Sequence, residues 1–317
     1  RKPVKAILKS VSRSFYLTIQ FLPRPLREPV SLAYLLARAT DTIADTSTIA
    51  ASVRLTTLHD LARVIAGDLE FDTIEGALRE FAAQQSDQHE RILVENLRNC
   101  FDWLAKIEAV DRAEIRAVLS TIVRGQRLDV ERFGDRSAVN SLCSAGELEE
   151  YTYLVAGCVG EFWTKLGFRR LPPFATRSAE EMARLGVSYG KGLQLINVLR
   201  DRNVDLRNGR DYLPAEELAK SQLEEVFARW LGEAEEQLDR GIDYCCSLTN
   251  WRVRFATALP ALIGARTIAL LRTAGPAREK IKVPRRKVQL IVLAALVASV
   301  SSGALRALHA RLRARPA

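Results

Sequence analysis

Apolar residues recur at helical spacing along most of the chain, and no segment alternates apolar and polar residues for long. Runs rich in Ala, Leu, Arg and Glu predict long helices, for example over residues 111–124, 179–202 and 215–243. Helix-breaking residues gather at 23–29, 132–144 and 171–173, and none of these stretches resembles a long flexible linker. The pattern therefore predicts an all-α protein.

Two predicted helices, residues 31–45 and 192–205, each end in a pair of aspartates four residues apart. Positions four apart share one face of a helix, so each helix presents two carboxylates on one stripe. The stripes extend further and hold Tyr34, Arg38, Asp41 and Asp45 in the first helix, and Gln194, Asn197, Asp201 and Asp205 in the second.

Apolar residues fill much of the remaining surface of both helices, so we expect both to be buried. A buried polar stripe is costly unless its groups are paired or bind a metal. The carboxylates could be solvated or paired with Arg38 and Arg200, or facing helices could hold Mg²⁺ between them. Mg²⁺ takes oxygen ligands and shares its remaining positions with water and substrate phosphates. Two such helices favour the metal hypothesis and predict a site that ionises a diphosphate. Because the two motifs have to cooperate in this site, we also expect a single domain over residues 1–317.

Five ordered motifs carry a family resemblance. They are SRSF at 12–15, DTIAD at 41–45, GQRLDV at 125–130, YTYLVAGCVG at 151–160, and QLINVLRDRNVD with RNGRDYLP over 194–214. With these motifs the chain resembles, over nearly its whole length, the squalene/phytoene synthase family of head-to-head isoprenyl diphosphate synthases. It departs from the family pattern at Gln126, where methionine is usual, and at Asn203 and Val204, where acidic residues are frequent.

The resemblance implies an isoprenoid synthase helical bundle with a central cavity lined by the two aspartate-rich helices. Mg²⁺, with Mn²⁺ as an alternative, would be held by Asp41, Asp45, Asn197, Asp201 and Asp205. The catalytic residues would be Tyr151, Tyr212, Asp41 and Asp201. The substrate would be bound by Ser12, Arg13, Ser14, Tyr34, Arg38, Gln194, Asn197, Arg200 and Arg210.

The reaction implied by the resemblance, which is strongest to bacterial squalene synthases, joins two farnesyl diphosphates into presqualene diphosphate. Reduction with NADPH would then give squalene. Alternatives are a presqualene diphosphate or hydroxysqualene synthase without reduction, and a phytoene or dehydrosqualene synthase. A terpene cyclase or head-to-tail elongase would lack the YxxxVAG and GRxYLP elements. A non-catalytic helical protein of the same fold is disfavoured by the intact aspartates.

The positive charge of the chain is concentrated near its C-terminus. The net charge is +9, and residues 272–317 hold 11 Lys and Arg against one acid, a balance of +10, which leaves about −1 for the rest. Basic segments attract anionic lipid and also bind nucleic acid nonspecifically. Because no nucleic-acid motif is present, we expect no specific nucleic acid and a peripheral membrane contact through the basic C-terminus, with a tail at about 306–317.

Residues 288–305 form an uncharged run of 18 residues, at the lower limit of a membrane-spanning helix. The alternative is a buried core helix that ends near 301–303, which the serines and glycine there favour. Five cysteines without a CxxC motif predict free, mostly buried thiols in a reducing compartment. We therefore expect a cytoplasmic protein, at the inner face of the membrane. Glycines at 186, 190 and 192 are expected to allow close helix packing.

Overall fold

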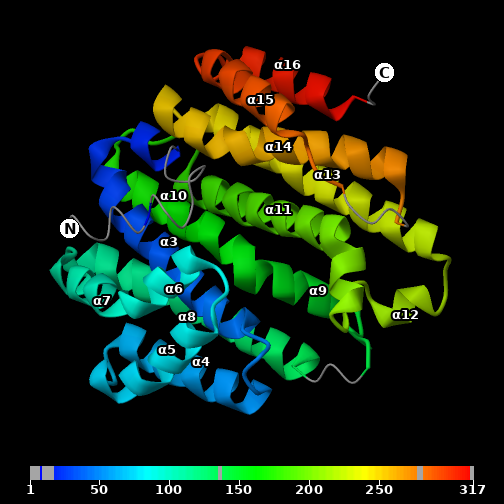
Figure 1. The fold of residues 1–317 in the computed structure, drawn as a ribbon. Coiled ribbons are helices and arrows are strands. Elements are labelled where there is room, and N and C mark those ends of the chain that lie inside the picture. Colours follow the sequence, from blue (N-terminus) through cyan, green and yellow to red (C-terminus); the bar gives the residue numbers. More distant parts are fainter. Residues whose placement is uncertain (1–7, 9–17, 135–137, 277–280, 315–317) are drawn as a thin grey trace. The chain divides into compact units, whose positions relative to one another are not determined.

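The computed structural model describes residues 8, 18–134, 138–276 and 281–314, and divides into two compact units, Arg1–Asp135 and Arg136–Ala317 (Figure 1). The described residues are mostly helical, which confirms the prediction of an all-α fold. The single domain and the shared central cavity stay predictions, and each unit is described by itself. The predicted substrate-binding residues Ser12, Arg13 and Ser14 lie outside the described residues.

Among the described residues, unit 1 contains six complete helices, and α8 packs against both α3 and α4. They are α3 (Arg24–Asp45), α4 (Ala51–Ala66), α5 (Asp72–Gln84), α6 (Gln88–Glu95), α7 (Leu97–Lys106) and α8 (Ala109–Phe133). α3 packs against α7 and α8, and α4 packs against α8 and α5. The helix predicted over 111–124 lies within α8. The prolines of 23–29 do not prevent a helix: Pro23 directly precedes α3, Pro25 lies in its first turn, where no intrahelical bond is lost, and Pro29 lies inside it.

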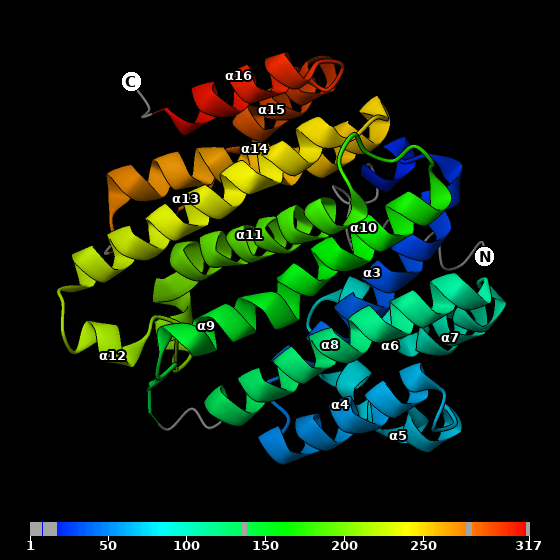
Figure 2. The same ribbon diagram turned by 180° about the vertical axis from the view of Figure 1, so that it is seen from behind.

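Unit 2 is built around α11 (Ala179–Arg207), which packs against α10 (Cys158–Arg170), α13 (Leu223–Ser247) and α14 (Trp251–Ala274) (Figure 2). α11 begins with a capping box between Ser178 and Glu181, where the sequence predicted the start of a helix. The helix predicted over 215–243 is divided into α12 (Ala215–Leu218) and α13, because the polar residues 220–222 offer the core no apolar side chain.

Glycines allow α11 to approach its neighbours closely, as the sequence predicted. A Cβ atom on Gly160 would collide with the carbonyl oxygen of Gly186, and one on Gly190 would collide with that of Ala156. On the other side of α11, a Cβ on Gly192 would lie 2.9 Å from the Cβ of Gln237. Helix α9 (Ala145–Thr152) is joined to α10 by a π-helical turn, η1 (Tyr153–Gly157), which also packs against α11.

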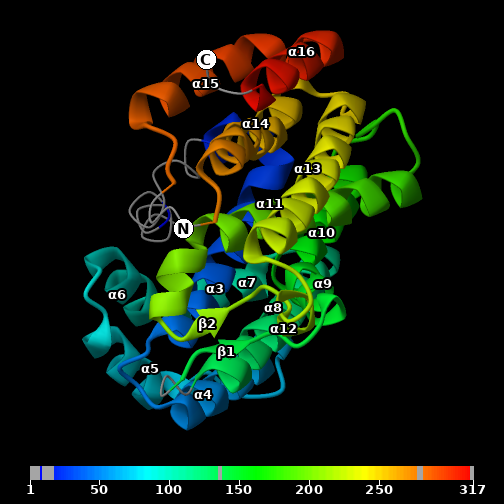
Figure 3. The ribbon, with the colours of Figure 1, turned by 90° about the vertical axis from the view of Figure 1, so that its right-hand side faces the viewer.

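The uncharged run 288–305 is neither a spanning helix nor a core helix. It is divided between α15 (Arg285–Ala298) and α16 (Ser302–Arg313), and the hydroxyl of Ser301 accepts a hydrogen bond from the N–H of Ala304 at the start of α16. Both helices lie on the side of α14 that faces away from α11 (Figures 1 and 3). The prediction of one core helix is wrong here. Composition shows that the run lacks charge, whereas the burial of a helix depends on which other helices pack against it.

The predicted C-terminal tail is also corrected, because its described part is folded. Residues 306–313 belong to α16, which packs against α13 and α14. Arg306 pairs with Asp243 at 2.5 Å, and Arg313 pairs with Asp239 at 2.6 Å and with Glu235 at 3.1 Å. These basic side chains therefore form ion pairs with acidic groups of α13.

Within the described residues, α14 has the length and hydropathy to cross a membrane, but 67% of its most apolar window is buried, so we assign it to the core of unit 2. None of the five cysteines forms a disulfide, and Cys100, Cys158 and Cys245 are buried. The prediction of free, mostly buried thiols is confirmed. Burial raises the pKa of the Cys100 thiol to about 12, so this group stays protonated and unreactive at neutral pH.

Candidate functional site

The first aspartate stripe lies along the accessible face of α3 in unit 1. Leu32, Leu35, Leu36 and Ile43 on the other faces are at most 1% exposed, and they anchor the helix in the core. Tyr34, Arg38 and Asp41 are half-buried and Asp45 is exposed. The helical spacing thus brings the four predicted residues onto one face, as expected, although this face is more accessible than predicted.

Charges around Asp41 are crowded and only partly neutralised. Arg38 donates to Asp41 Oδ2 at 2.6 Å and also pairs with Glu90 of α6. Burial, followed by the charge of Asp45, raises the pKa of Asp41 to about 6, although Arg38 acts in the opposite direction. The Asp41 side chain keeps 42% of its surface accessible, so water screens part of this repulsion. The stripe therefore carries more negative charge than its arginine neutralises.

Two residues that support this stripe have no signal in the sequence. Glu90 lies 52 positions from Arg38 in an ordinary polar segment. Arg54 is 3% exposed, and its guanidinium donates to the carbonyl oxygens of Ala44 at 2.7 Å and Ile49 at 3.1 Å. A cation at the C-terminal end of a helix interacts favourably with the helix dipole. Arg54 therefore fixes the last turn of α3, which carries Asp41 and Asp45.

The second stripe lies on α11 in unit 2, next to two tyrosines from other segments. The Nε2 of Gln194 donates to Tyr151 Oη at 3.4 Å, and Asn197 Nδ2 lies 3.4 Å from Gln194 Oε1. The rings of Tyr151 and Tyr212 stack with centroids 4.8 Å apart and planes at 24°. Four predicted residues from two motifs and three segments of the chain thus form one cluster.

The carboxylates of α11 follow this cluster along the helix. Arg200 Nε donates to Asp201 Oδ1 at 2.8 Å, and a second hydrogen bond joins the same two side chains. This bonding raises the pKa of the Arg200 guanidinium despite its partial burial. Asp201 and Asp205 are half-buried on the same face. The arginine that the sequence suggested as a possible neutralising partner does pair with an aspartate.

A buried ion pair that sequence reasoning missed holds the segment that carries Tyr212. Arg202 donates from Nε to Asp211 Oδ1 at 3.2 Å and from Nη2 to Oδ2 at 2.6 Å. The N–H of Leu213 also donates to Asp211 Oδ1, at 3.1 Å. Strand β2 (Arg210–Asp211), which contains the predicted Arg210, pairs in parallel with β1 (Asn140–Ser141) (Figure 3). These contacts position Tyr212 against Tyr151.

Both stripes offer the donor set that a hard cation requires. Carboxylate and amide oxygens are the ligands that Mg²⁺ prefers. A bound cation would relieve the repulsion by Asp45 that, after burial, raises the pKa of Asp41. Among the described residues, no three His, Cys, Asp or Glu side chains form a group able to hold a metal ion. The stripe on α3 would therefore need water or substrate oxygens to complete its coordination, and the stripe on α11 would need the same groups besides Asn197.

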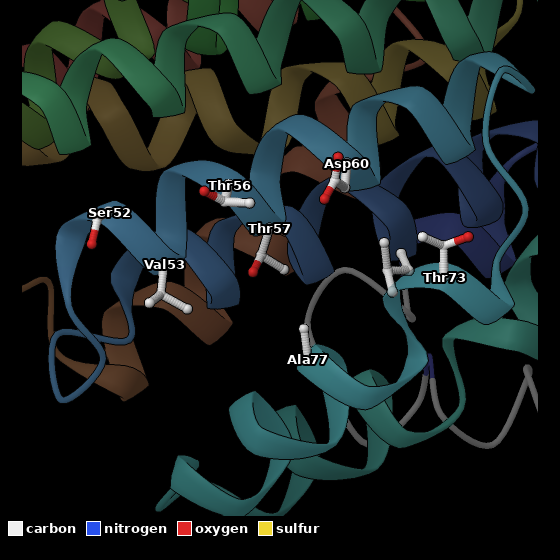
Figure 4. Close-up of a pocket in the computed structure, with 8 residues that line it drawn as sticks. Ser52, Val53, Thr56, Thr57, Asp60, Thr73 and Ala77 are labelled. Atoms are coloured by element: carbon white, nitrogen blue, oxygen red, sulfur yellow. The ribbon is translucent and has the colours of Figure 1, made fainter.

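A pocket in unit 1 lies apart from the predicted residues, between α4 and α5 (Figure 4). Hydroxyl groups of Ser52, Thr56, Thr57 and Thr73 line it, together with a single carboxylate, Asp60. Asp60 lies 3.9 Å from Arg63. The pocket contains neither a paired carboxylate nor a stacked ring, so it offers no chemistry comparable with that of the two stripes.

The mostly helical fold and the carboxylate stripes define the class of protein, a helical isoprenoid synthase. The squalene/phytoene synthase family model matches residues 8–287, so the chain belongs to this family of prenyltransferase-type enzymes. The chain is 28% identical over 212 residues to a squalene synthase of Candida albicans, covering 66% of this chain and 44% of that protein. It is 27% identical over 251 residues to the 15-cis-phytoene synthase of Synechococcus elongatus, covering 76% and 71%.

Solved structures show the same fold. TcSQS with the ligand BPH1237 is 20% identical, with a TM-score of 0.75 and coverage of 99% of this chain and 91% of that one. Squalene synthase HpnC from Alicyclobacillus acidocaldarius is 19% identical, with a TM-score of 0.55 and coverage of 85% and 92%. The chain spans about a third to somewhat under half the length of several curated relatives, such as 34% of a Phaeosphaeria nodorum lycopene cyclase/phytoene synthase.

Proposed function

We propose that the protein condenses two farnesyl diphosphates head-to-head to presqualene diphosphate and then reduces this intermediate with NADPH to squalene. The observation that carries the proposal is the cluster of Tyr151, Tyr212, Gln194 and Asn197. It lies beside the part of α11 that leads to Asp201, because Asn197 is one turn before this aspartate. Relatives named squalene synthase and phytoene synthase match the chain at similar identity. The family is therefore shown by the comparisons, whereas the product is our proposal.

The arginines would bind and orient the diphosphate of the substrate. A guanidinium donates two parallel hydrogen bonds to phosphate oxygens, which makes it suited to this role. Arg38 and Arg200 each pair with an aspartate of the stripes, so diphosphate binding would exchange one anionic partner for another. Arg210 would contribute from β2, beside Tyr212. This exchange would keep the substrate close to the carboxylates that bind the metal.

Mg²⁺, or Mn²⁺ in its place, would be held by Asp41 and Asp45 on α3 and by Asn197, Asp201 and Asp205 on α11. When bound, it would supply Lewis-acid assistance to departure of the diphosphate. Tyr151 and Tyr212 would orient the diphosphate or accept the proton lost when the cyclopropane ring closes. Their stacked rings, together with the apolar residues of α11, would exclude water from the allylic cation. NADPH would donate the hydride of the second step, and no residue is assigned to it.

The test is an incubation of the protein with radiolabelled farnesyl diphosphate and Mg²⁺, with and without NADPH. Presqualene diphosphate should accumulate without NADPH and be converted to squalene when NADPH is added. Presqualene diphosphate as the final product in both arms, hydroxysqualene, or a dehydrosqualene would replace squalene in the proposal. A 40-carbon product from geranylgeranyl diphosphate would identify a phytoene synthase instead.

Metal dependence is tested with the same assay. Excess EDTA should abolish turnover, and Asp41→Ala and Asp201→Ala should each lower it by orders of magnitude while the far-ultraviolet circular dichroism stays unchanged. The matched control is Asp68→Ala, an exposed aspartate in the loop after α4, which should keep full activity. Full turnover in EDTA would contradict the mechanism.

We also propose that the protein works in the cytoplasm, in peripheral contact with the inner face of the membrane. The basic balance of residues 272–317 supports this contact, since Lys and Arg near an anionic surface are each attracted by about 1 kcal/mol. The pairing of Arg306 and Arg313 with acidic residues leaves the predicted tail less charge to offer than its composition suggested.

A further inference from the structure

The most exposed apolar side chains among the described residues lie on α15 and in the turn that follows it. Leu290, Leu293, Val297 and Val300 are 64%, 62%, 73% and 69% exposed. The other large apolar residues with high exposure are scattered over several elements, and the most exposed of them is Val139 at 56%. Leu290, Leu293 and Val297 follow one another at intervals of three and four residues, so they share one face of the helix.

The opposite face of α15 is packed. Ile291, Ala295 and Ala298 are buried, and α15 contacts α14 and α16. The helix is thus held in place by one face while its other face presents leucine and valine to the surroundings. A surface helix in a globular protein normally carries polar residues on this outward face, so folding of unit 2 does not explain the stripe.

A group of exposed basic residues stands at the start of the same helix. Arg285, Arg286 and Lys287 occupy its first turn, and none of them forms an ion pair with a described residue. Cations in the first turn oppose the helix dipole, so they do not serve the stability of α15. Arg286 lies one turn before Leu290, and therefore continues the apolar stripe with a positive charge.

We propose that this face of α15, with Leu290, Leu293, Val297, Arg285, Arg286 and Lys287, inserts together with Val300 of the following turn into the surface of an anionic lipid bilayer. The inference deepens the proposed peripheral membrane contact by naming the element that makes it. An interfacial helix combines an apolar face with basic residues and lies in the membrane plane. With 14 residues, α15 is about 21 Å long and too short to cross a hydrocarbon core of about 30 Å.

Charge complementarity selects the lipid over a second copy of the chain. A symmetric contact between two copies through this face would place two sets of exposed basic residues, Arg285, Arg286 and Lys287, in one interface, and like charges across an interface disfavour association. An anionic bilayer offers opposite charge and an apolar interior at once. The stripe and the basic turn are then used together, with the charges at the level of the lipid headgroups.

The test measures partitioning of the full chain onto vesicles of phosphatidylcholine, alone or with about one lipid in three replaced by phosphatidylglycerol. The variant Leu293→Gln/Val297→Gln should lower partitioning onto the anionic vesicles at least about tenfold. Replacing the three basic residues by Gln should lower it about 100-fold at low salt and less at high salt. Val53→Gln/Val110→Gln, at exposed positions of unit 1, is the matched control and should partition like the unaltered chain.

Insertion has its own signature, because a tryptophan at Leu293→Trp should shift its fluorescence to shorter wavelength when anionic vesicles are added. Equal partitioning of the Leu293→Gln/Val297→Gln variant and the unaltered chain would overturn the proposal. The proposal would also be overturned if the unaltered chain were a dimer that this variant dissociates, while both proteins partition equally onto vesicles. That result would identify a second copy of the chain as the occupant of the face. Turnover of farnesyl diphosphate in solution is measured in parallel on the unaltered chain. If this chain turns over substrate but does not bind anionic vesicles, only this inference is contradicted; if it binds vesicles without turnover, only the proposed reaction is contradicted.

Discussion

Removal of Asp211 should destabilise the protein far more than removal of an exposed ion-pair partner. The side chains of Arg202 and Asp211 are only 10% and 6% exposed. Asp211→Ala would leave the guanidinium of Arg202 buried without its carboxylate and the N–H of Leu213 without its acceptor. Loss of one partner of a buried ion pair costs about 3–5 kcal/mol. For a unit of this size, each kcal/mol lowers the Tm by about 2–4 °C, so we expect a decrease of roughly 6–20 °C.

Thermal unfolding measured by circular dichroism tests this magnitude. The matched control is Asp243→Ala, which removes the partner of Arg306 in a pair whose side chains are 52% and 37% exposed, and should cost at most about 1 kcal/mol. Arg202→Met/Asp211→Leu should recover most of the lost stability, because an apolar pair can replace a buried ion pair. Equal Tm values for Asp211→Ala and Asp243→Ala would refute the reasoning, as would a double variant less stable than Asp211→Ala.

Three further predictions concern the aspartate helix and the packing of unit 2. Burial and then the neighbouring aspartate raise the pKa of Asp41 from 3.8 to about 6. Between these pH values, the metal-free folded state therefore holds a proton on Asp41 that the unfolded chain has already lost. In EDTA, the stability of the unaltered protein relative to Asp41→Asn should consequently fall as the pH rises from about 4 to about 6, and a flat difference would contradict the assigned pKa. Glu90→Gln should lower the pKa of Asp41 by removing a nearby negative charge, as measured by carboxyl NMR, while the loss of its half-buried pair with Arg38 leaves the fold intact; an unchanged pKa would exclude this coupling. Gly160→Val should cost about 1–3 kcal/mol or more, because it collides with the backbone of α11, whereas Gly232→Ala, with no atom within 4 Å of the added Cβ, should be neutral or stabilising; equal stability of the two variants would count against close packing.

Helical periodicity was sufficient to predict which residues share the stripes of α3 and α11, although the stripes are more accessible than the sequence predicted. Both helices place apolar residues on the remaining faces, so the position of each aspartate follows from its spacing alone. The meeting of Tyr151, Tyr212 and Gln194 is different in kind, because it joins three segments by tertiary contact. Only the resemblance of ordered motifs to a known family indicated that these residues belong to one cluster.

The residues that the sequence did not reveal act through long-range contacts of charged groups. Glu90 and Arg54 lie in segments whose composition is that of an ordinary helix surface, and nothing local distinguishes them from solvated charges. Arg202 and Asp211 stand inside a recognised motif, yet their pairing depends on the turn between α11 and β2. The uncharged run 288–305 misled the prediction for the opposite reason, since an apolar stripe and a buried face have the same composition.

The π-helical turn Tyr153–Gly157 sets the phase between two parts of one continuous helical rod. Before it, Tyr151 faces Tyr212; after it, Gly160 faces Gly186. Each residue of an α-helix turns the chain by about 100°, so deleting one residue between these two positions would rotate one contact out of alignment while leaving the other in place. This stretch should therefore accept changes of side chain far more readily than changes of length, and natural variation within it should appear as substitutions rather than as insertions or deletions.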